Sequence, residues 1–198
     1  MIASALVFSS TAAYSEDLGG LYLKAYGGAS MLSDTDVSGS VVGSANFETG
    51  PVTGGALGYN FGDSPFRAEL EWAWRSGEAK TFAGGASGDF ASTTALLNGY
   101  YDIAEFQSIT PYVGFGAGYV TEIDWDITGG TAPGEYSDRG GLAWQVMTGI
   151  NYAVSERIGF LAELRYFDAG SRTISGSAGN IKADYASTEG IVGLYFSF

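Results

Sequence analysis

The sequence predicts an all-β fold: an eight-stranded antiparallel up-and-down transmembrane β-barrel. Eight segments of alternating apolar and polar residues follow residue 20. Each is close in length to a membrane-spanning strand, which has about 9–11 residues. The connections between these segments are alternately long and short, and in every segment one of the two faces has no charged side chain except at a strand end, where Asp168 and Asp184 lie. Together these observations are typical of a barrel that crosses a bilayer with its strands.

The elements can be followed in order along the chain. We expect strands at 21–31, 52–61, 66–77, 90–103, 111–123, 142–154, 157–168 and 183–198. Tight turns are predicted at 62–65 and 155–156, with a short connection at 104–110. Four longer segments, rich mainly in Asp, Ser, Gly and Ala, are expected to form loops at the other end: 32–50, 78–89, 124–141 and 169–182.

Segment 66–77 shows the alternation most clearly. Its apolar face consists of Phe66, Ala68, Leu70, Trp72 and Trp74. Its opposite face carries Arg67, Glu69, Glu71 and Arg75. A Lys or Arg on the lipid face costs about 2–4 kcal/mol at the bilayer midplane. The clean separation is therefore expected if the apolar face meets lipid.

Alternation alone leaves two orientations open, because a soluble lipocalin-like ligand carrier would turn the apolar face inward. Small residues share the charged face, as expected in a narrow interior, for example Gly54 and Gly58. That face is also nearly charge-balanced, which matters for buried charges and not for solvated ones. We therefore predict a charge network inside the barrel, formed by Lys24, Arg67, Glu69, Glu71, Arg75, Asp102, Glu163, Arg165 and Glu189.

Aromatic residues lie near the predicted strand ends, as in the interfacial girdles of membrane barrels. On the loop side they are Trp74, Trp144 and Tyr166. On the turn side they include Phe61, Tyr101 and Tyr152.

Composition narrows the function classes. The net charge of −13 argues against nucleic-acid binding, which uses basic patches. The chain has no cysteine, which excludes disulfides and thiolate metal sites. It has no histidine either, so the commonest general base and metal ligand is missing. We predict no cofactor, no metal site and no enzymatic activity.

The first residues differ from the rest of the chain. Residues 1–18 contain a short apolar core at 2–8 and small residues at 11–13, which predicts a signal peptide or its remnant. No basic residue precedes the apolar core, because Lys24 is the first in the chain. Residues 19–198 are predicted to form the single barrel domain.

The C-terminus carries the most specific motif. The chain ends on Phe198, with Phe196 two residues before it and Gly193 five residues before it. This ending resembles the β-signal by which outer-membrane barrels are recognised by the barrel assembly machinery. The segments 98–102, 110–114 and 162–166 also look like parts of this kind of protein. On these segments and the C-terminal motif, the chain resembles the OmpA-like, opacity-porin type of small outer-membrane barrel. The resemblance implies a location in the outer membrane of a Gram-negative bacterium, without fixing a task.

The charged face allows more than one interpretation. The Glu69 and Glu71 carboxylates could serve acid–base chemistry, but an eight-stranded barrel has room only for side chains, which favours a plug of ion pairs. Small-barrel hydrolases such as lipid A deacylases and outer-membrane proteases use a histidine, which this chain lacks. The leading hypothesis is a structural or surface-interaction role. The alternatives are a narrow porin-like channel for small solutes and the lipocalin-like carrier.

The partners expected from the sequence follow from its charge and its surface. We expect contact with outer-membrane lipid and lipopolysaccharide, and with the assembly machinery during biogenesis. The predicted loops hold much of the acidic excess and could bind an extracellular partner. A monomer is expected.

Overall fold

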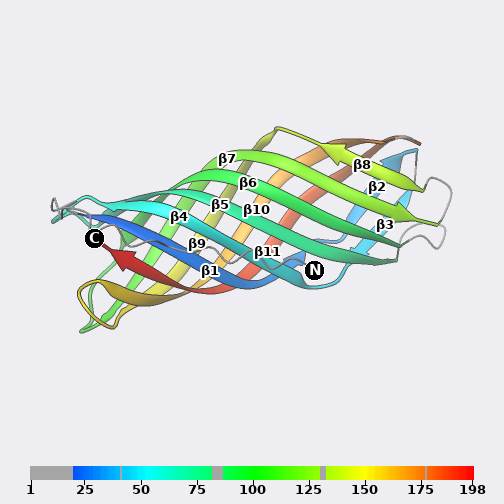
Figure 1. Cartoon of the computed structure of the whole chain (residues 1–198). Coiled ribbons are helices and arrows are strands. Elements are labelled where there is room, and N and C mark those ends of the chain that lie inside the picture. The colour runs from blue at the N-terminus through cyan, green and yellow to red at the C-terminus, as the bar shows by residue number, and fades with distance from the viewer. Residues whose placement is uncertain (1–19, 41, 82–86, 130–132, 177) are drawn as a thin grey trace, which may run out of the picture.

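Figure 1 shows a computed structural model in which the regular structure of the described residues is all β-strand. The structure describes residues 20–40, 42–81, 87–129, 133–176 and 178–198. The predicted signal segment 1–18 lies outside these described residues. The described part of the chain contains no helix long and apolar enough to cross a membrane.

Eight long strands close into a ring. They are β1 (Leu21–Leu32), β4 (Gly50–Asn60), β5 (Phe66–Thr81), β6 (Ser87–Asp102), β7 (Ile109–Thr128), β9 (Leu142–Ala153), β10 (Ile158–Gly176) and β11 (Gly179–Ser197). Each pairs antiparallel with the next in this order. The last strand, β11, pairs back to β1, with Tyr22 opposite Ser197 and Ser30 opposite Glu189. The predicted eight-stranded antiparallel fold is confirmed.

Three short strands continue the barrel beyond the ends of β1, β4 and β9. They are β2 (Thr35–Gly39), β3 (Gly43–Phe47) and β8 (Gly134–Asp138). β2 pairs with β11 and β3, β3 also pairs with β5, and β8 pairs with β7 and β10. We call these three strands, with the parts of β5, β6, β7, β10 and β11 beside them, the outer section. It lies at the end of the barrel opposite the C-terminus (Figure 1).

The four long loops were therefore predicted to be longer than they are. Residues 124–128 belong to β7, 134–138 form β8, and 169–176 extend β10. These residues also alternate, but with the opposite polarity: Ile123, Trp125 and Ile127 point inward and are buried, while Asp124 and Asp126 are exposed. The outer section thus has the polarity of a water-soluble barrel, which a search for an apolar outer face misses.

Two zones fill the interior. In the outer section the interior is an apolar core of aliphatic and aromatic side chains, including Phe90, Trp125, Phe167 and Tyr185. Their rings pack against one another, with centroids 5.0 Å apart for Phe90 and Tyr185 and 5.2 Å apart for Phe167 and Tyr185. The rest of the interior is mainly polar and charged, with two small clusters of buried apolar side chains that include Leu161 and Met147. The boundary between the zones lies near Arg75, whose guanidinium lies over the Phe167 ring.

The outer surface beside the polar zone is apolar. Leu70, Trp72 and Leu164 are 62%, 56% and 63% exposed, while the alternating Glu69 and Glu71 are 1% exposed. A soluble barrel would bury the leucines and expose the glutamates. This geometry contradicts the lipocalin-like alternative and matches a barrel surrounded by hydrocarbon.

Inward-facing glycines make room for inward-facing rings. A Cβ atom on Gly58 would overlap the ring of Tyr22, and one on Gly114 would fall 2.6 Å from the ring of Tyr100. Gly99 points outward, and a Cβ there would meet nothing closer than 4.0 Å. The small residues of the charged face thus leave the space that the large side chains of the lumen fill.

Candidate functional site: the charged lumen and the acidic outer surface

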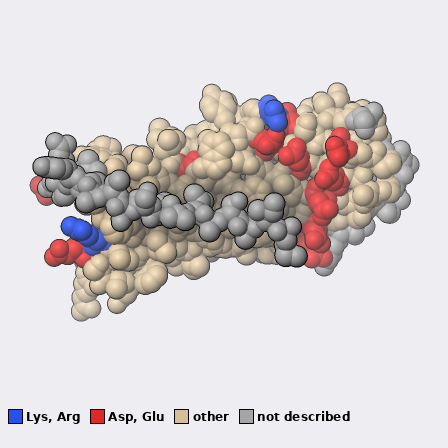
Figure 2. All heavy atoms as spheres, in the orientation of Figure 1, with Lys and Arg blue, Asp and Glu red and all other residues tan. Residues whose placement is uncertain are grey.

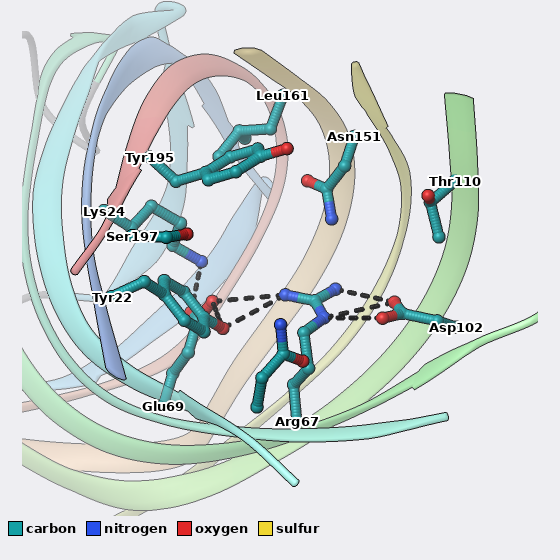
Figure 3. A pocket seen from close by; sticks show the side chains of 11 residues that line it. Tyr22, Lys24, Arg67, Glu69, Asp102, Thr110, Asn151, Leu161, Tyr195 and Ser197 are labelled. Atoms are coloured by element: carbon teal, nitrogen blue, oxygen red, sulfur yellow. Dashed lines mark hydrogen bonds and ion pairs between the residues drawn. The ribbon is translucent and has the colours of Figure 1, made fainter. Parts of the chain in front are cut away.

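The first layer of lumen charges lies at the end of the barrel that carries the short turns. Lys24 on β1 pairs with Glu69 on β5, and Arg67 on β5 pairs with Asp102 on β6 through Nη2 and Oδ1 at 2.9 Å. Tyr22 donates to Glu69 at 2.7 Å and accepts from Arg67 at 3.1 Å. Figure 3 shows these side chains converging from three strands.

A cavity of about 130 Å³ borders this first layer. Its lining also includes Thr110, Asn151, Leu161, Tyr195 and Ser197 (Figure 3). The Arg67 guanidinium lies between two rings, 4.8 Å from the centroid of Tyr100 and 5.0 Å from that of Tyr112. The charged groups of the cavity are thus already held by partners in the wall.

The second layer is centred on Arg165 of β10. Its Nη1 and Nη2 atoms donate to the two carboxylate oxygens of Glu71 at 2.9 and 3.0 Å. Its Nη2 also donates to Glu163 at 2.8 Å. Tyr112 donates to Glu163 at 2.9 Å, and Gln145 donates to Glu71 at 3.2 Å. One guanidinium thus neutralises two buried carboxylates from different strands.

The third layer borders the apolar core. Arg75 on β5 pairs with Glu189 on β11 through its Nε atom at 2.5 Å. Its Nη1 atom donates to Thr94 at 2.9 Å, and Ser187 donates to Glu189 at 2.9 Å. The side chains of Arg75 and Glu189 are both fully buried. This layer therefore lies between the polar zone and the apolar core of the outer section.

The structure thus places all nine residues of the predicted charge network inside the barrel and brings them together in three layers. Every Lys and Arg among them has a carboxylate within ion-pair distance. Pairing of this kind is what makes burial of charge tolerable, because an unpaired buried charge is very costly. Above the third layer the apolar core fills the interior. The arrangement is therefore a packed plug.

The sequence analysis missed the uncharged members of the network. They are Tyr22, Tyr26, Asn98, Tyr100, Tyr112 and Gln145. The signal was present, because each lies on the face of its segment opposite the apolar one. Tyr22 and Tyr112 donate to the carboxylates of Glu69 and Glu163, and both Asn98 and Gln145 donate to Glu71. The hydroxyls of Tyr26 and Tyr100 instead accept from Arg165 and Lys24, so these uncharged groups supply further hydrogen bonds to buried charges.

The predicted girdle residues lie on the outer surface at both ends of the apolar belt. Trp74, Trp144 and Tyr166 are 40%, 40% and 38% exposed, and the rings of Trp144 and Tyr166 lie 5.7 Å apart. At the turn end, Phe61, Tyr101 and Tyr152 are between 43% and 52% exposed.

The C-terminal motif lies on β11 against β1. Phe196 and Phe198 are outward and their ring centroids are 5.4 Å apart. The Phe198 amide donates to the Leu21 carbonyl at 3.1 Å. A Cβ atom on Gly193 would collide with the Ala25 carbonyl and the Tyr26 side chain, so this position needs a glycine.

An unusual acidic surface covers the outer section. Glu78 on β5 lies opposite Asp89 on β6, Asp89 opposite Asp126 on β7, and Asp126 opposite Glu135 on β8. We call these four residues the acidic row. All four are exposed, and none has an ion-pair partner within the described ranges. Like charges in directly opposite positions destabilise a sheet.

The acidic row borders a surface groove of about 380 Å³, whose lining also includes Glu48 and Asp124. Figure 2 shows acidic side chains gathered at this end of the molecule, while the middle of the barrel is almost free of charge. No three carboxylates in the described part of the chain converge as metal ligands would. The surface is thus an extended strip of negative charge.

A family model described as "Outer membrane protein beta-barrel domain" matches residues 1–198. The chain belongs to this family. Outer membrane protein PagN of Salmonella typhimurium is 31% identical over 172 residues, which covers 73% of this chain and 72% of PagN. The resemblance to small outer-membrane barrels that the sequence suggested is confirmed, and so is a location in the bacterial outer membrane.

Solved structures agree with this family assignment at the level of the fold. Neisserial surface protein A aligns with a TM-score of 0.56 at 20% identity, covering 90% of this chain and 97% of that protein. Outer membrane protein AlkL, solved in lipid bilayers, aligns with a TM-score of 0.52 at 16% identity, covering 99% and 97%.

Membership of this family gives the orientation of the barrel. Outer-membrane barrels have short periplasmic turns and longer extracellular connections. The turns at 62–65 and 154–157 therefore face the periplasm, and the outer section projects from the cell. The acidic row begins two outward positions beyond Trp74 on β5, at the level where lipid headgroups meet water.

Proposed function

We propose that this outer-membrane barrel has a structural and surface-interaction role without catalysis, and that the acidic row is its interaction surface. The observation that carries the proposal is the row of four carboxylates on adjacent strands, none of which has an ion-pair partner among the described residues. A rigid sheet holds them side by side although their repulsion destabilises it. Such an arrangement becomes favourable when cations lie over it.

The surroundings of the row suggest the partner. Lipopolysaccharide carries phosphate groups at the level just above the outer aromatic girdle. Divalent cations over the acidic row would bridge its carboxylates to these phosphates. We therefore propose that the acidic row binds lipopolysaccharide through divalent cations. The alternative is that a cationic extracellular partner binds the acidic row.

The packed lumen supports a non-catalytic role and argues against the channel alternative. Each carboxylate of the lumen is held by an arginine or lysine in the wall. A general acid or base needs a group free to exchange a proton with substrate. A solute would have to displace three layers of ion pairs and then the apolar core.

The C-terminal motif supports a proposal about biogenesis. Gly193, Phe196 and Phe198 lie on the strand that closes the barrel against β1. We propose that the assembly machinery recognises this strand before closure. The protein is proposed to act as a monomer.

The surface role can be tested with matched charge variants. The test variant is Asp89→Asn with Asp126→Asn and Glu135→Gln, which neutralises three members of the row. The control is Asp63→Asn with Glu105→Gln and Glu156→Gln, which removes the same charge at the exposed periplasmic end. Each protein is reconstituted in vesicles with and without lipopolysaccharide, and its thermal unfolding is followed with calcium or with chelator.

The expected result is that calcium raises the melting temperature of the wild type and of the control only in vesicles with lipopolysaccharide. The row variant should lose this rise and melt higher than the wild type in chelator, because the repulsion is gone. An equal calcium response in the row variant would contradict the proposal. A response in vesicles without lipopolysaccharide would mean that the cations bind without bridging.

A further inference from the structure

The barrel wall is interrupted between β10 and the segment that joins β8 to β9. β9 pairs with β10 as far as Trp144 opposite Asp168, and β8 pairs with β10 only from Ser137 opposite Ser175. Between these points, residues 169–174 and 139–143 are all described and form no backbone pairs with each other. We call this interruption the seam.

Both sides of the seam are shaped by local backbone features. On β10, a register shift lies between Asp168 and Ser171, and Gly170 has a positive φ of 65°. On the other side, Gly140 donates to the Val120 carbonyl at 3.0 Å, and the Val120 amide donates to Gly141 at 3.0 Å. This segment is thus held to β7 and turned away from β10.

One side chain crosses the seam. Arg172 lies opposite Ala183, at a position that points toward the interior. Its guanidinium donates to the carboxylate of Asp138, which lies opposite the buried Ile123, and to the Gly140 carbonyl. The Arg172 and Asp138 side chains are 14% and 20% exposed. A Cβ atom on Gly141 would overlap the guanidinium, so the glycine leaves the space that Arg172 occupies.

The apolar core lies directly behind Arg172. A small cavity of about 20 Å³ is lined by Arg172 together with Ile123, Trp125, Ile174 and Tyr185. The seam begins just beyond Trp144 and Tyr166 of the outer girdle, at headgroup level. An arginine at an inward position of an apolar core is costly unless its charge is paired and its hydrogen bonds are made.

We propose that Arg172 is a clasp that closes a lateral seam in the outer section, and that its release opens a side passage between the membrane surface and the apolar core. Charge-assisted hydrogen bonds are about twice as strong as neutral ones, so two of them can stand in for missing ladder bonds. The adjacent Arg139–Glu122 pair has no such role, because its side chains are 76% and 40% exposed.

Hydrogen–deuterium exchange of the reconstituted protein tests the clasp. Arg172→Met keeps an apolar stem and removes the donors, and Arg139→Met is the matched control on the same surface. In Arg172→Met, amides at 138–143 and 169–176 should exchange faster by about tenfold or more, as loss of a charge-assisted hydrogen bond predicts. Amides of β4 and the first half of β5 should exchange as in the wild type.

Two outcomes would overturn the proposal: unchanged exchange at the seam in Arg172→Met, or the same increase in Arg139→Met. If Arg172→Met fails to fold, as seen by loss of its heat-dependent gel shift, Asp138→Asn weakens the same clasp from the other side. Asp138→Asn must then raise exchange at the same two segments, and unchanged exchange there would equally refute the clasp.

Discussion

Removing the charge of Arg165 tests the description of the lumen as a plug of ion pairs. Arg165 donates to Glu71 at 2.9 and 3.0 Å and to Glu163 at 2.8 and 3.1 Å, and all three side chains are fully buried. Arg165→Met keeps much of the volume but leaves two carboxylates without a cation. Removing one partner of a buried pair typically costs about 3–5 kcal/mol.

A loss of that size is large against a total stability of about 5–15 kcal/mol. With a urea slope of about 2 kcal/mol per M, the unfolding midpoint should fall by about 2 M. The assay is urea unfolding of vesicle-reconstituted protein, followed by tryptophan fluorescence and by the gel shift between boiled and unboiled samples. Arg139→Met, which removes an exposed arginine, should leave the midpoint unchanged.

Neutralising the partners should restore most of the loss. In Arg165→Met with Glu71→Gln and Glu163→Gln, no unpaired charge remains, and amides can accept and donate where carboxylates only accepted. The reasoning would be refuted if Arg165→Met matched the wild-type midpoint. It would also be refuted if the triple variant were no more stable than the single one.

Three further predictions concern other parts of the barrel. Gly58→Ala should destabilise the protein by about 1–3 kcal/mol, because the added methyl group overlaps the Tyr22 ring. Gly99→Ala, at an outward position, should be neutral or stabilising in the same urea assay. Equal effects of the two variants would contradict the described packing of the lumen. Phe198→Ser should lower the amount of folded protein in outer membranes by gel shift, and normal assembly would count against the C-terminal motif. Burial raises the pKa of Tyr185 to about 12, and unfolded tyrosine titrates near pH 10. The stability that protonated Tyr185 contributes should therefore be complete below pH 10 and decline toward pH 12. Tyr185→Phe should flatten this decline in urea midpoints measured from pH 9 to 12, and an unchanged slope would argue against its burial.

The eight strands and the charged residues of the lumen could be predicted from alternation because both depend only on which face a residue occupies. Lys24, Glu69, Glu71 and Arg165 share the charged face of their segments, and the barrel brings every such face inside. The pairing of Arg165 with Glu71 and of Arg75 with Glu189 could not be predicted. These contacts join strands far apart in the sequence and depend on strand tilt and register.

The outer section was missed for a different reason. Segments such as 35–39 and 134–138 contain Asp, Glu and Ser at the outward positions and also include Gly, a composition that in isolation indicates a loop. Their inward residues, Val37 and Tyr136, are buried in the apolar core. The same alternation continues with reversed polarity because the solvent outside the strands changes from hydrocarbon to water.

The central claim is that three layers of ion pairs and an apolar core close the lumen, so the protein works from its surface. Planar-bilayer recording of the purified wild-type protein shows whether the lumen is closed. We expect no discrete current steps from protein shown to be folded by its gel shift. Reproducible steps of uniform size, altered in size by Glu69→Ala or Glu71→Ala, would show that solutes pass through the lumen and would contradict the account.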